Sequence, residues 1–350
     1  MEDLILGFGL IFLGALCGGS FGLPSKFAKA DTPWEVLWGP FFLIATILIP
    51  CIVAPLVVND LFGVYWHATV GPKTLLMVLL FGLLWGLGSM TLGMSFSFIG
   101  LSLAYALNYG AQIACGFLLP ILIFTPDQLL KPHGGTFLVG VVVCLIGVIV
   151  SGRAGILKER SIADSQPGEA VEEKASKQPK TIIGLAIGVL SGVLCACYAV
   201  ASSYAGPIGA AAGENNPAWA AAWAVTALIL WGGAVSSCSY CVVQLSKNKT
   251  WGHFAKPGVG LVLLLAATMA LLHDAAIFFF GLAWITLGDN MAVGYGYPVF
   301  MAFAIIVGNV HGFRSGEWKG ASRQSVMWIV AGIALLVIGV CVIATGKSLM

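Results

Sequence analysis

Two adjacent ionisable residues, His273 and Asp274, lie close to the middle of a long apolar segment at residues 259–285. Burial disfavours the charged form of a carboxylate, and a histidine titrates near neutral pH, so either side chain could take up and release a proton. Ionisable groups at mid-membrane depth usually face a cavity or a partner, and they are functional by default. The pair therefore predicts a proton-coupling site, in which His273 also contacts the ligand. A polar contact that only satisfies two buried side chains is the alternative.

Tyr105, Asn108 and Gln112 form a second group of candidates, in an apolar segment at residues 101–124. Spacings of three and four residues place them on one face of a helix. Amide groups offer donors and acceptors that suit vicinal hydroxyls, and tyrosine adds a flat apolar ring with a hydroxyl at its tip. This chemistry suits a sugar. Hydrogen bonds between helices and aromatic packing are the alternative interpretation.

Further candidates lie in other apolar segments. Trp85 and Ser89 are four residues apart, and Tyr295 and Tyr297 are two residues apart. We expect these four residues to contact the same ligand, with packing as the alternative. Glu35 lies in the first turn of a segment that begins at residue 34, where the helix N-terminus favours a carboxylate. Helix capping is sufficient to explain Glu35. After His273 and Asp274, Glu35 is the third candidate for proton coupling.

The elements that must position these residues are apolar segments of membrane-spanning length. Hydrophobic residues make up 59% of the 350 residues and charged residues 9%, whereas a soluble domain carries roughly 25% charged residues. A hydrocarbon core of roughly 30 Å requires roughly 20 apolar residues per helix. The sequence therefore predicts an all-α membrane protein. Its ten predicted transmembrane helices are residues 4–23, 34–57, 74–96, 101–124, 136–151, 182–206, 219–244, 259–285, 291–310 and 325–345.

Lysine and arginine are distributed unequally between alternate loops. Cytoplasmic loops carry an excess of these residues, so the distribution orients the chain. The loops after the first, third, fifth, seventh and ninth predicted helices carry 14 of the 17 basic residues. The remaining loops and both termini carry only Lys73, Lys131 and Lys347. This predicts that both termini lie on the periplasmic or extracellular side.

A charged segment at residues 153–180 lacks apolar periodicity and is predicted to be a flexible cytoplasmic linker. It separates an N-terminal five-helix repeat, residues 1–152, from a C-terminal one, residues 181–350. A unit with an odd number of crossings has an inverted second copy, which is a common design of secondary transporters. Ten helices without a true repeat, in a structural or enzymatic role, are the alternative. Similarities between the halves pair Gly93, Gly100, Ala104 and Tyr109 with Gly281, Gly288, Ala292 and Tyr297, and Gly140 and Gly147 with Gly332 and Gly339.

Small residues recur along the first predicted helix. Gly14, Gly18 and Gly22 are four residues apart and therefore share one helix face. Such a stripe lets another backbone approach closely. We expect the helix at residues 4–23 to pack tightly against a neighbour.

The sequence contains no nucleotide-binding loop, zinc-ligand spacing, nucleophile elbow or dinucleotide fingerprint in a credible context. We therefore expect no cofactor, no metal and no enzymatic activity. Cys238-x-x-Cys241 has metal-like spacing, but it lies inside an apolar helix without a second pair, and packing explains it. The basic residues of the linker are expected to meet lipid headgroups and not nucleic acid.

Four local sequences resemble the L-rhamnose-proton symporter family of the drug/metabolite transporter superfamily. They are Pro24-x-Lys26-x-x-Lys29 followed by Trp34-Glu35-x-x-Trp38, Phe81-Gly82-x-x-Trp85-Gly86, Arg153-Ala154-Gly155-x-Leu157-Lys158-Glu159-Arg160, and Glu317-Trp318-Lys319. The resemblance covers most of the chain and implies ten helices in two inverted five-helix repeats, the drug/metabolite transporter fold. It also implies import of a deoxyhexose such as L-rhamnose together with a proton, across a bacterial inner membrane. The chain departs from the enteric type of this family at Ile277, where that type has glutamine, so a related deoxy sugar or another small polar metabolite is an alternative substrate.

These observations predict a proton-coupled sugar importer that works by alternating access. Its partners would be the sugar, protons and the lipid bilayer, and its oligomeric state a monomer or a homodimer. An exporter of drugs or metabolites from the same superfamily is the alternative function. An integral membrane enzyme or sensor is a second alternative, but it would need a cluster of catalytic groups near one surface, and the sequence offers none.

Overall fold

The structure is a computed structural model that describes residues 2–164, 171–291 and 296–348. Every regular element in these ranges is helical, which confirms the all-α prediction. The longer helices are α1 (Glu2–Ser20), α2 (Trp34–Leu43), α3 (Ile49–Val57), α5 (Pro72–Phe124), α6 (Pro132–Asp164), α7 (Val171–Cys195), α10 (Ala218–Lys247), α11 (Val259–Met291), α12 (Tyr297–Arg314) and α13 (Arg323–Ser348). The short elements are η1 (Leu23–Phe27), η2 (Ile44–Leu48), α4 (Leu61–Tyr65), η3 (Pro126–Leu130), α8 (Cys197–Tyr204), α9 (Gly206–Gly213) and η4 (Trp251–Ala255).

Eight helical stretches of the described chain are long and apolar enough to cross a membrane. They are Asp3–Phe27, Trp34–Val57, Pro72–Phe124, Gly134–Ile162, Lys180–Tyr204, Ala218–Lys247, Val259–Ala283 and Arg323–Thr345. Val299–Arg314 is a shorter apolar helix. Large apolar side chains such as Ile5, Leu56 and Ile149 are more than half exposed on these helices, as a hydrocarbon solvent allows. The protein is therefore a multi-pass membrane protein, while the count of ten and the inverted repeat stay predictions.

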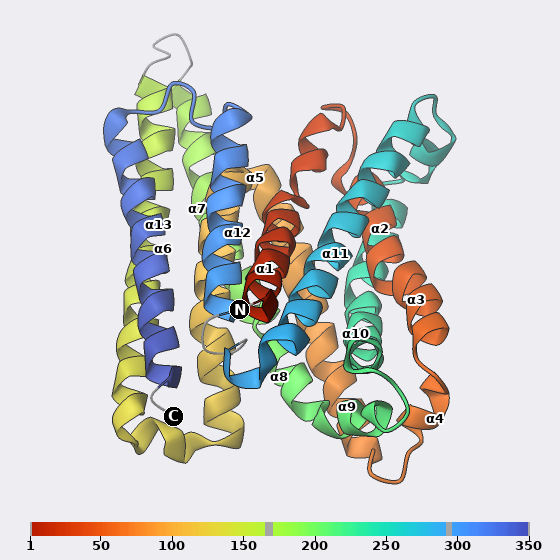
Figure 1. Cartoon of the computed structure of the whole chain (residues 1–350). Coiled ribbons are helices and arrows are strands. Elements are labelled where there is room, and N and C mark those ends of the chain that lie inside the picture. Colours follow the sequence, from red (N-terminus) through yellow and green to blue (C-terminus); the bar gives the residue numbers. More distant parts are fainter. Residues whose placement is uncertain (1, 165–170, 292–295, 349–350) are drawn as a thin grey trace.

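Helix α5 consists of two arms joined at Gly100, where φ is 79° and ψ is 170°. Side chains other than hydrogen clash with the backbone in this conformation, so glycine is required here. Figure 1 shows that the orange first arm rises to the upper end of the molecule and that the second arm returns to the lower end. The two arms correspond to the predicted helices at residues 74–96 and 101–124.

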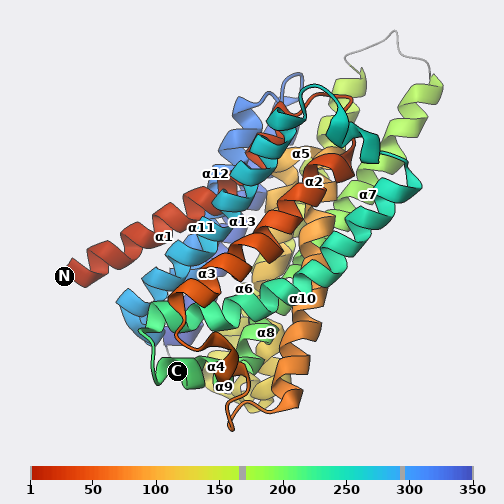
Figure 2. The ribbon, with the colours of Figure 1, turned by 90° about the vertical axis from the view of Figure 1, so that its right-hand side faces the viewer.

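The bundle has two edges with different partners. In Figure 1, α6 and α13 run side by side at one edge, whereas α2, α3 and α10 form the other. Helix α1 lies between them and packs on α11 and α12, and α7 packs along α5. In Figure 2 the first turns of α1 extend beyond the other helices. The candidate residues at 273 and 274 therefore belong to a helix that packs on α1.

Helix also occupies much of the segment for which the sequence predicts a linker. Helix α6 continues past Ser151 to Asp164, and α7 begins at Val171. Ala154 and Lys158 in this extension are buried. The packing of α6 against neighbouring helices thus continues beyond the apolar segment predicted at residues 136–151.

The glycine stripe of α1 lies in tight contact with its neighbours, as predicted. A Cβ added at Gly14 would lie 3.1 Å from the carbonyl oxygen of Ala276 on α11. A Cβ added at Gly18 would lie 3.4 Å from the ring of Phe300 on α12. The first contact brings α1 against the turn of α11 that follows Asp274.

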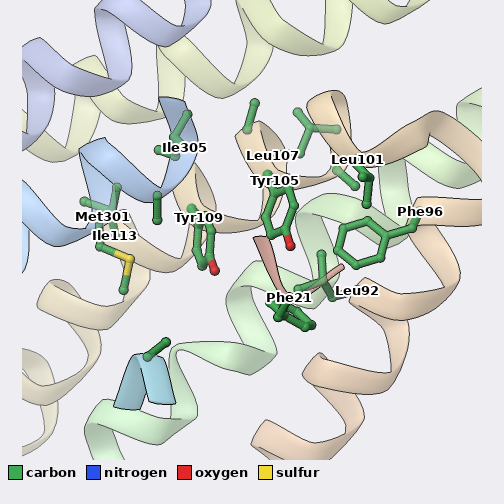
Figure 3. Packing of buried hydrophobic residues seen from close by; sticks show 14 of the residues in the cluster. Phe21, Leu92, Phe96, Leu101, Tyr105, Leu107, Tyr109, Ile113, Met301 and Ile305 are labelled. Carbon is green, nitrogen blue, oxygen red and sulfur yellow. The ribbon is translucent and has the colours of Figure 1, made fainter. Parts of the chain in front are cut away.

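The main core lies where the second arm of α5 meets α1 and α12. Tyr105 is fully buried there, and its ring stacks on that of Tyr109 with centroids 5.5 Å apart. Figure 3 shows these two rings side by side, with Phe96 and Phe21 close to Tyr105. Aromatic packing of this kind fixes the second arm relative to α1.

Helices α6 and α13 approach each other through glycines. A Cβ added at Gly140 would lie 2.9 Å from the carbonyl oxygen of Gly339, and one at Gly339 would lie 2.9 Å from the carbonyl oxygen of Gly140. Further along, a Cβ at Gly332 would lie 3.1 Å from the carbonyl oxygen of Gly147. Small residues are thus required along this crossing because the backbones themselves are in contact.

Replacing Gly140 with leucine should separate the two helices and destabilise the protein by about 1–3 kcal/mol, because a backbone carbonyl cannot move aside as a side chain can. The melting temperature of the purified protein in detergent is the measurement. Gly152→Leu on the same helix is the matched control, since nothing lies within 4 Å of a Cβ added there. An equal effect of both substitutions would contradict the prediction.

Candidate functional site

His273 and Asp274 are in direct contact on α11. The Nδ1 atom of His273 lies 2.7 Å from Oδ1 of Asp274, a hydrogen-bond distance. Their side chains are 13% and 6% exposed. The second carboxylate oxygen of Asp274, Oδ2, is buried and has no hydrogen-bond partner among the described residues. Because a buried acceptor without a partner is costly, Oδ2 is well suited to accept a hydroxyl from a ligand or to carry a proton.

Aromatic rings from the N-terminal half enclose the imidazole of His273. The centroids of Phe21 and Phe41 lie 5.6 Å and 5.8 Å from that of His273, both edge to face. Trp85, on the first arm of α5, lies 5.8 Å away at an interplanar angle of 39°. Phe21 follows α1, Phe41 lies on α2 and Trp85 lies on α5. Three segments of the N-terminal half therefore contact His273, a residue of the C-terminal half.

A groove lies beside this pair, between the first turns of α10 and the second half of α11. It encloses about 310 Å³ of space that is partly open to the outside. The ring of Tyr198 on α8 lies 5.9 Å from that of Trp85. Ile277, the departure from the enteric type, lines the groove, one turn after His273. The complete lining is Trp219, Ala222, Trp223, Thr226, Ile277, Phe278, Gly281 and Leu282.

Of the residues predicted from sequence, Trp85 is brought next to His273. Ser89, one turn further along the same arm of α5, is buried. Tyr297 begins α12, and its backbone alone is described. Tyr295 lies outside the described residues.

Tyr105 and Asn108 contact neighbouring helices. The hydroxyl of Tyr105 accepts a hydrogen bond from the backbone N–H of Gly22, at 2.9 Å. The amide of Asn108 donates to Ser191 Oγ on α7, at 2.8 Å, while its Oδ1 atom is buried without a partner in the described structure. Gln112, one turn later, is partly buried. Two of these three residues are thus directed to the segment between α1 and η1 and to α7, and not to Asp274.

Glu35 is held at the end of the bundle by the segment that follows α10. Its Oε1 atom accepts hydrogen bonds from Asn248 Nδ2 at 3.0 Å and from Thr250 Oγ1 at 2.8 Å. The residue is buried in the first turn of α2. Glu35 thus has two polar partners of its own, and neither belongs to the Asp274 pair.

Sequence reasoning missed the buried carboxylate of Glu317, whose side chain is 4% exposed. One oxygen lies 2.6 Å from Lys26 Nζ and also accepts the backbone N–H of Leu101 at 2.6 Å. The other oxygen accepts the backbone N–H of Ser102 at 3.0 Å. These two amides begin the second arm of α5 directly after Gly100, where helical N–H groups lack helical acceptors. Lys26 and Glu317 are 291 residues apart, so no local signal could have paired them.

Polar and aromatic groups extend this contact, and we name the set formed by Lys26, Ser102, Lys158, Asn309, Glu317 and Trp318 the Glu317 cluster. The indole N–H of Trp318 donates to Ser102 Oγ at 3.0 Å. The same hydroxyl donates to Asn309 Oδ1 at 2.5 Å. Lys158 Nζ lies 5.2 Å above the ring of Trp318, a cation–π arrangement. The cluster joins η1, the second arm of α5, α6, α12 and the segment after α12.

Among the described residues, no group of three or more histidine, cysteine, aspartate or glutamate side chains is arranged to hold a metal ion. The chemistry available at the Asp274 pair is therefore that of proton transfer, hydrogen bonding and aromatic contact.

Comparison with known families decides the assignment. The model of the L-rhamnose-proton symport protein (RhaT) family matches residues 1–348. The chain belongs to this family. It is 29% identical over 346 residues to the L-rhamnose-proton symporter of Citrobacter koseri and 28% identical to that of Escherichia coli, with 96% of each chain covered. The RhaT family consists of transporters and not of enzymes, and the resemblance inferred from the motifs is confirmed.

Three of the four sequences that carry the resemblance to the RhaT family meet in the Glu317 cluster. Lys26 belongs to the first, Lys158 to the third and Glu317 with Trp318 to the fourth. The second contributes Trp85, which contacts His273. These sequences thus contribute to the Glu317 cluster and to the ring enclosure of His273, and the first also contains Glu35.

Glu317→Gln should lower the stability by about 1–3 kcal/mol, because glutamine loses the ion pair with Lys26 and offers one acceptor oxygen to two N–H donors. Melting temperature in detergent, supported by a double-substitution cycle with Lys26→Gln, measures the loss. Glu214→Gln is the control, because that carboxylate is 57% exposed and faces only His67, at 3.7 Å. Full additivity in the cycle would contradict a direct interaction between Lys26 and Glu317.

Proposed function

We propose that this protein imports L-rhamnose or a related deoxyhexose together with a proton across a bacterial inner membrane. The single observation that carries the proposal is the buried Asp274, paired with His273 in the middle of α11 and left with one unpartnered oxygen. Membership of the RhaT family and the names of the similar proteins support the same substrate and coupling ion.

Sugar binding would combine ring contacts with hydrogen bonds. The apolar face of a hexose packs on aromatic rings, and Trp85, Phe41 and Phe21 supply rings around His273. An ionised carboxylate only accepts hydrogen bonds, so Oδ2 of Asp274 would receive one sugar hydroxyl. We also assign Ser89, Tyr105, Asn108, Gln112, Tyr295 and Tyr297 to the wider site as candidates, of which Ser89 is adjacent to Trp85 on the helix.

Coupling would follow from the protonation state of the Asp274 pair. Deprotonated Asp274 is a charge in an apolar setting, and among the described residues His273 is the group that stabilises it. Protonation removes that charge and gives the carboxyl group an O–H donor. We therefore propose that the pair must be protonated, or bound to sugar hydroxyls, for the surrounding rings to rearrange. Glu35, bound to Asn248 and Thr250, is the secondary candidate for a proton site.

The described conformation fits one end state of alternating access. The Glu317 cluster joins the helices at the upper end of Figure 1, while the groove between α10 and α11 is open near the other end. The basic loops place the upper end in the cytoplasm and both termini outside. We infer that the Glu317 cluster joins η1, α5, α6 and α12 at the cytoplasmic end in this state.

Ten crossings in two inverted repeats are consistent with the helices. Counting the two arms of α5 separately and adding Val299–Arg314 to the eight long stretches gives ten. The equivalences at residues 140 and 332 and at residues 147 and 339 support a two-fold relation, because Gly140 meets Gly339 and Gly147 meets Gly332. If each residue is replaced by its equivalent in the other half, the contact of Gly140 with Gly339 becomes that of Gly332 with Gly147. We propose repeats at residues 1–152 and 181–350, with residues 153–180 between them.

Asp274→Asn should abolish stimulation of uptake by a pH gradient while leaving sugar exchange measurable, because asparagine cannot bind the coupled proton but retains a polar side chain of similar size. Labelled L-rhamnose entering proteoliposomes under an imposed gradient provides the measurement. Asp127→Asn, in the exposed η3 element, is the control and should keep full stimulation. Gradient-driven uptake by the Asp274→Asn variant would refute the assigned role, and outward-only transport by the unchanged protein would favour an exporter.

Trp85→Ala should weaken L-rhamnose binding by roughly twofold to tenfold, the effect of losing one ring contact of about 0.5–1.5 kcal/mol. Trp85→Phe should retain part of the affinity because a ring remains. Titration calorimetry on the purified protein measures both, with Trp219→Ala as a control because that side chain lies on the groove away from the His273 rings and is 40% exposed. Unchanged binding after Trp85→Ala would place the sugar elsewhere.

A further inference from the structure

A second groove lies at the upper end of the bundle, between the segment that links η1 to α2 and the segment that links η4 to α11. It encloses about 520 Å³ of space, part of it open to the outside. Its lining residues come from both halves of the chain and are Ala28, Lys29, Asp31, Thr32, Val36, His253, Lys256, Pro257, Gly258, Val259, Leu261, Val262 and Leu265. We name it the Lys29 groove.

The charged groups of the Lys29 groove are mainly basic. The ammonium of Lys29 reaches the opposite segment, where it lies 3.6 Å from the position of a Cβ added at Gly258. Lys256 Nζ lies 3.1 Å from His253 Nε2. Asp31 is the one acidic residue of the lining, and no ion pair within 4.0 Å joins either lysine to a carboxylate of the described chain. Two ammonium groups and one carboxylate thus line the groove, and among the described residues neither ammonium is held in a close ion pair.

The other wall of the groove is apolar and continues onto the membrane-facing surface. Val36, Val262 and Leu265 line it. Leu261 and Leu264 on the adjoining face of α11 are 44% and 62% exposed. A soluble anion would gain nothing from this wall, whereas an acyl chain would gain from covering it.

The depth of the groove matches that of lipid headgroups. The membrane-spanning stretches Trp34–Val57 and Val259–Ala283 begin directly after its two lysines. Phe27 and Trp251, which are 65% and 50% exposed, lie in η1 and η4 at the same end. Exposed aromatic residues beside basic ones are typical of a membrane–water interface.

We propose that the Lys29 groove binds the headgroup of an anionic phospholipid, with Lys29 and Lys256 contacting its phosphate and Val36, Val262 and Leu265 contacting the start of an acyl chain. Basic pockets between transmembrane helices bind acidic headgroups in this way. The lipid would bridge segments of the two halves, beside Glu35 and its partners Asn248 and Thr250. This inference concerns lipid binding in the absence of sugar and does not depend on the proposed function.

The test is the binding of phosphatidylglycerol to the delipidated protein in detergent, measured by native mass spectrometry and by melting temperature. Phosphatidylcholine of the same acyl chains and inorganic phosphate are the comparison ligands. We expect phosphatidylglycerol alone to bind and to raise the melting temperature. Lys29→Gln with Lys256→Gln should weaken its binding roughly tenfold to thirtyfold, while Lys29→Arg with Lys256→Arg should retain it.

Lys247→Gln with Lys249→Gln is the matched control. It removes the same charge at the same end of the bundle, from the end of α10 and the residues after it, outside the groove lining. Loss of binding in the control equal to that in the groove variant would overturn the proposal, since attraction would then be unspecific. An equal response to phosphatidylcholine would exclude selection for an anion, and an equal response to inorganic phosphate would exclude a lipid site. The melting temperature of each variant without lipid shows whether it is folded.

Discussion

The turn of α5 at Gly100 creates the main electrostatic problem of this structure, and Glu317 solves it. The break exposes the first amides of the second arm inside an otherwise apolar bundle, where unpaired N–H groups are costly. The carboxylate of Glu317 accepts two of them, and Lys26 balances its charge. The position of the second arm depends on this arrangement, and with it the contacts of Tyr105 with Gly22 and of Asn108 with α7.

Two buried carboxylates, those of Glu317 and Asp274, differ in how fully they are satisfied. Both oxygens of Glu317 have partners, and a lysine neutralises it. Asp274 has one partner, His273, and one oxygen with none in the described structure. A fully bonded charge gains little from a change of partner, whereas an incompletely bonded one is stabilised by a proton or by a hydroxyl. This difference in bonding separates a structural carboxylate from a candidate site for coupling.

Depth in an apolar segment was enough to single out His273 and Asp274 from sequence, because few polar groups occur there. Helical spacing also gave the shared face of Tyr105 and Asn108, but spacing does not say which neighbour covers that face. Glu317 lies in a short polar segment with Arg314 and Lys319, so it resembles a solvated loop residue. Its burial follows from the meeting of α5, α12 and η1, which is a property of tertiary structure alone.

The distribution of contacts between the halves bears on the proposed mechanism. Backbone contact at Gly140 and Gly339 leaves α6 and α13 little freedom to slide, since no side chain can adjust between them. The imidazole of His273, in contrast, touches the N-terminal half through the rings of Phe21, Phe41 and Trp85, which can change rotamer or tilt. A rocking motion about the glycine crossing would therefore change the surroundings of the Asp274 pair most. Binding of a sugar and a proton at that pair would then alter the energies of the two end states differently, which is the thermodynamic requirement for coupled transport.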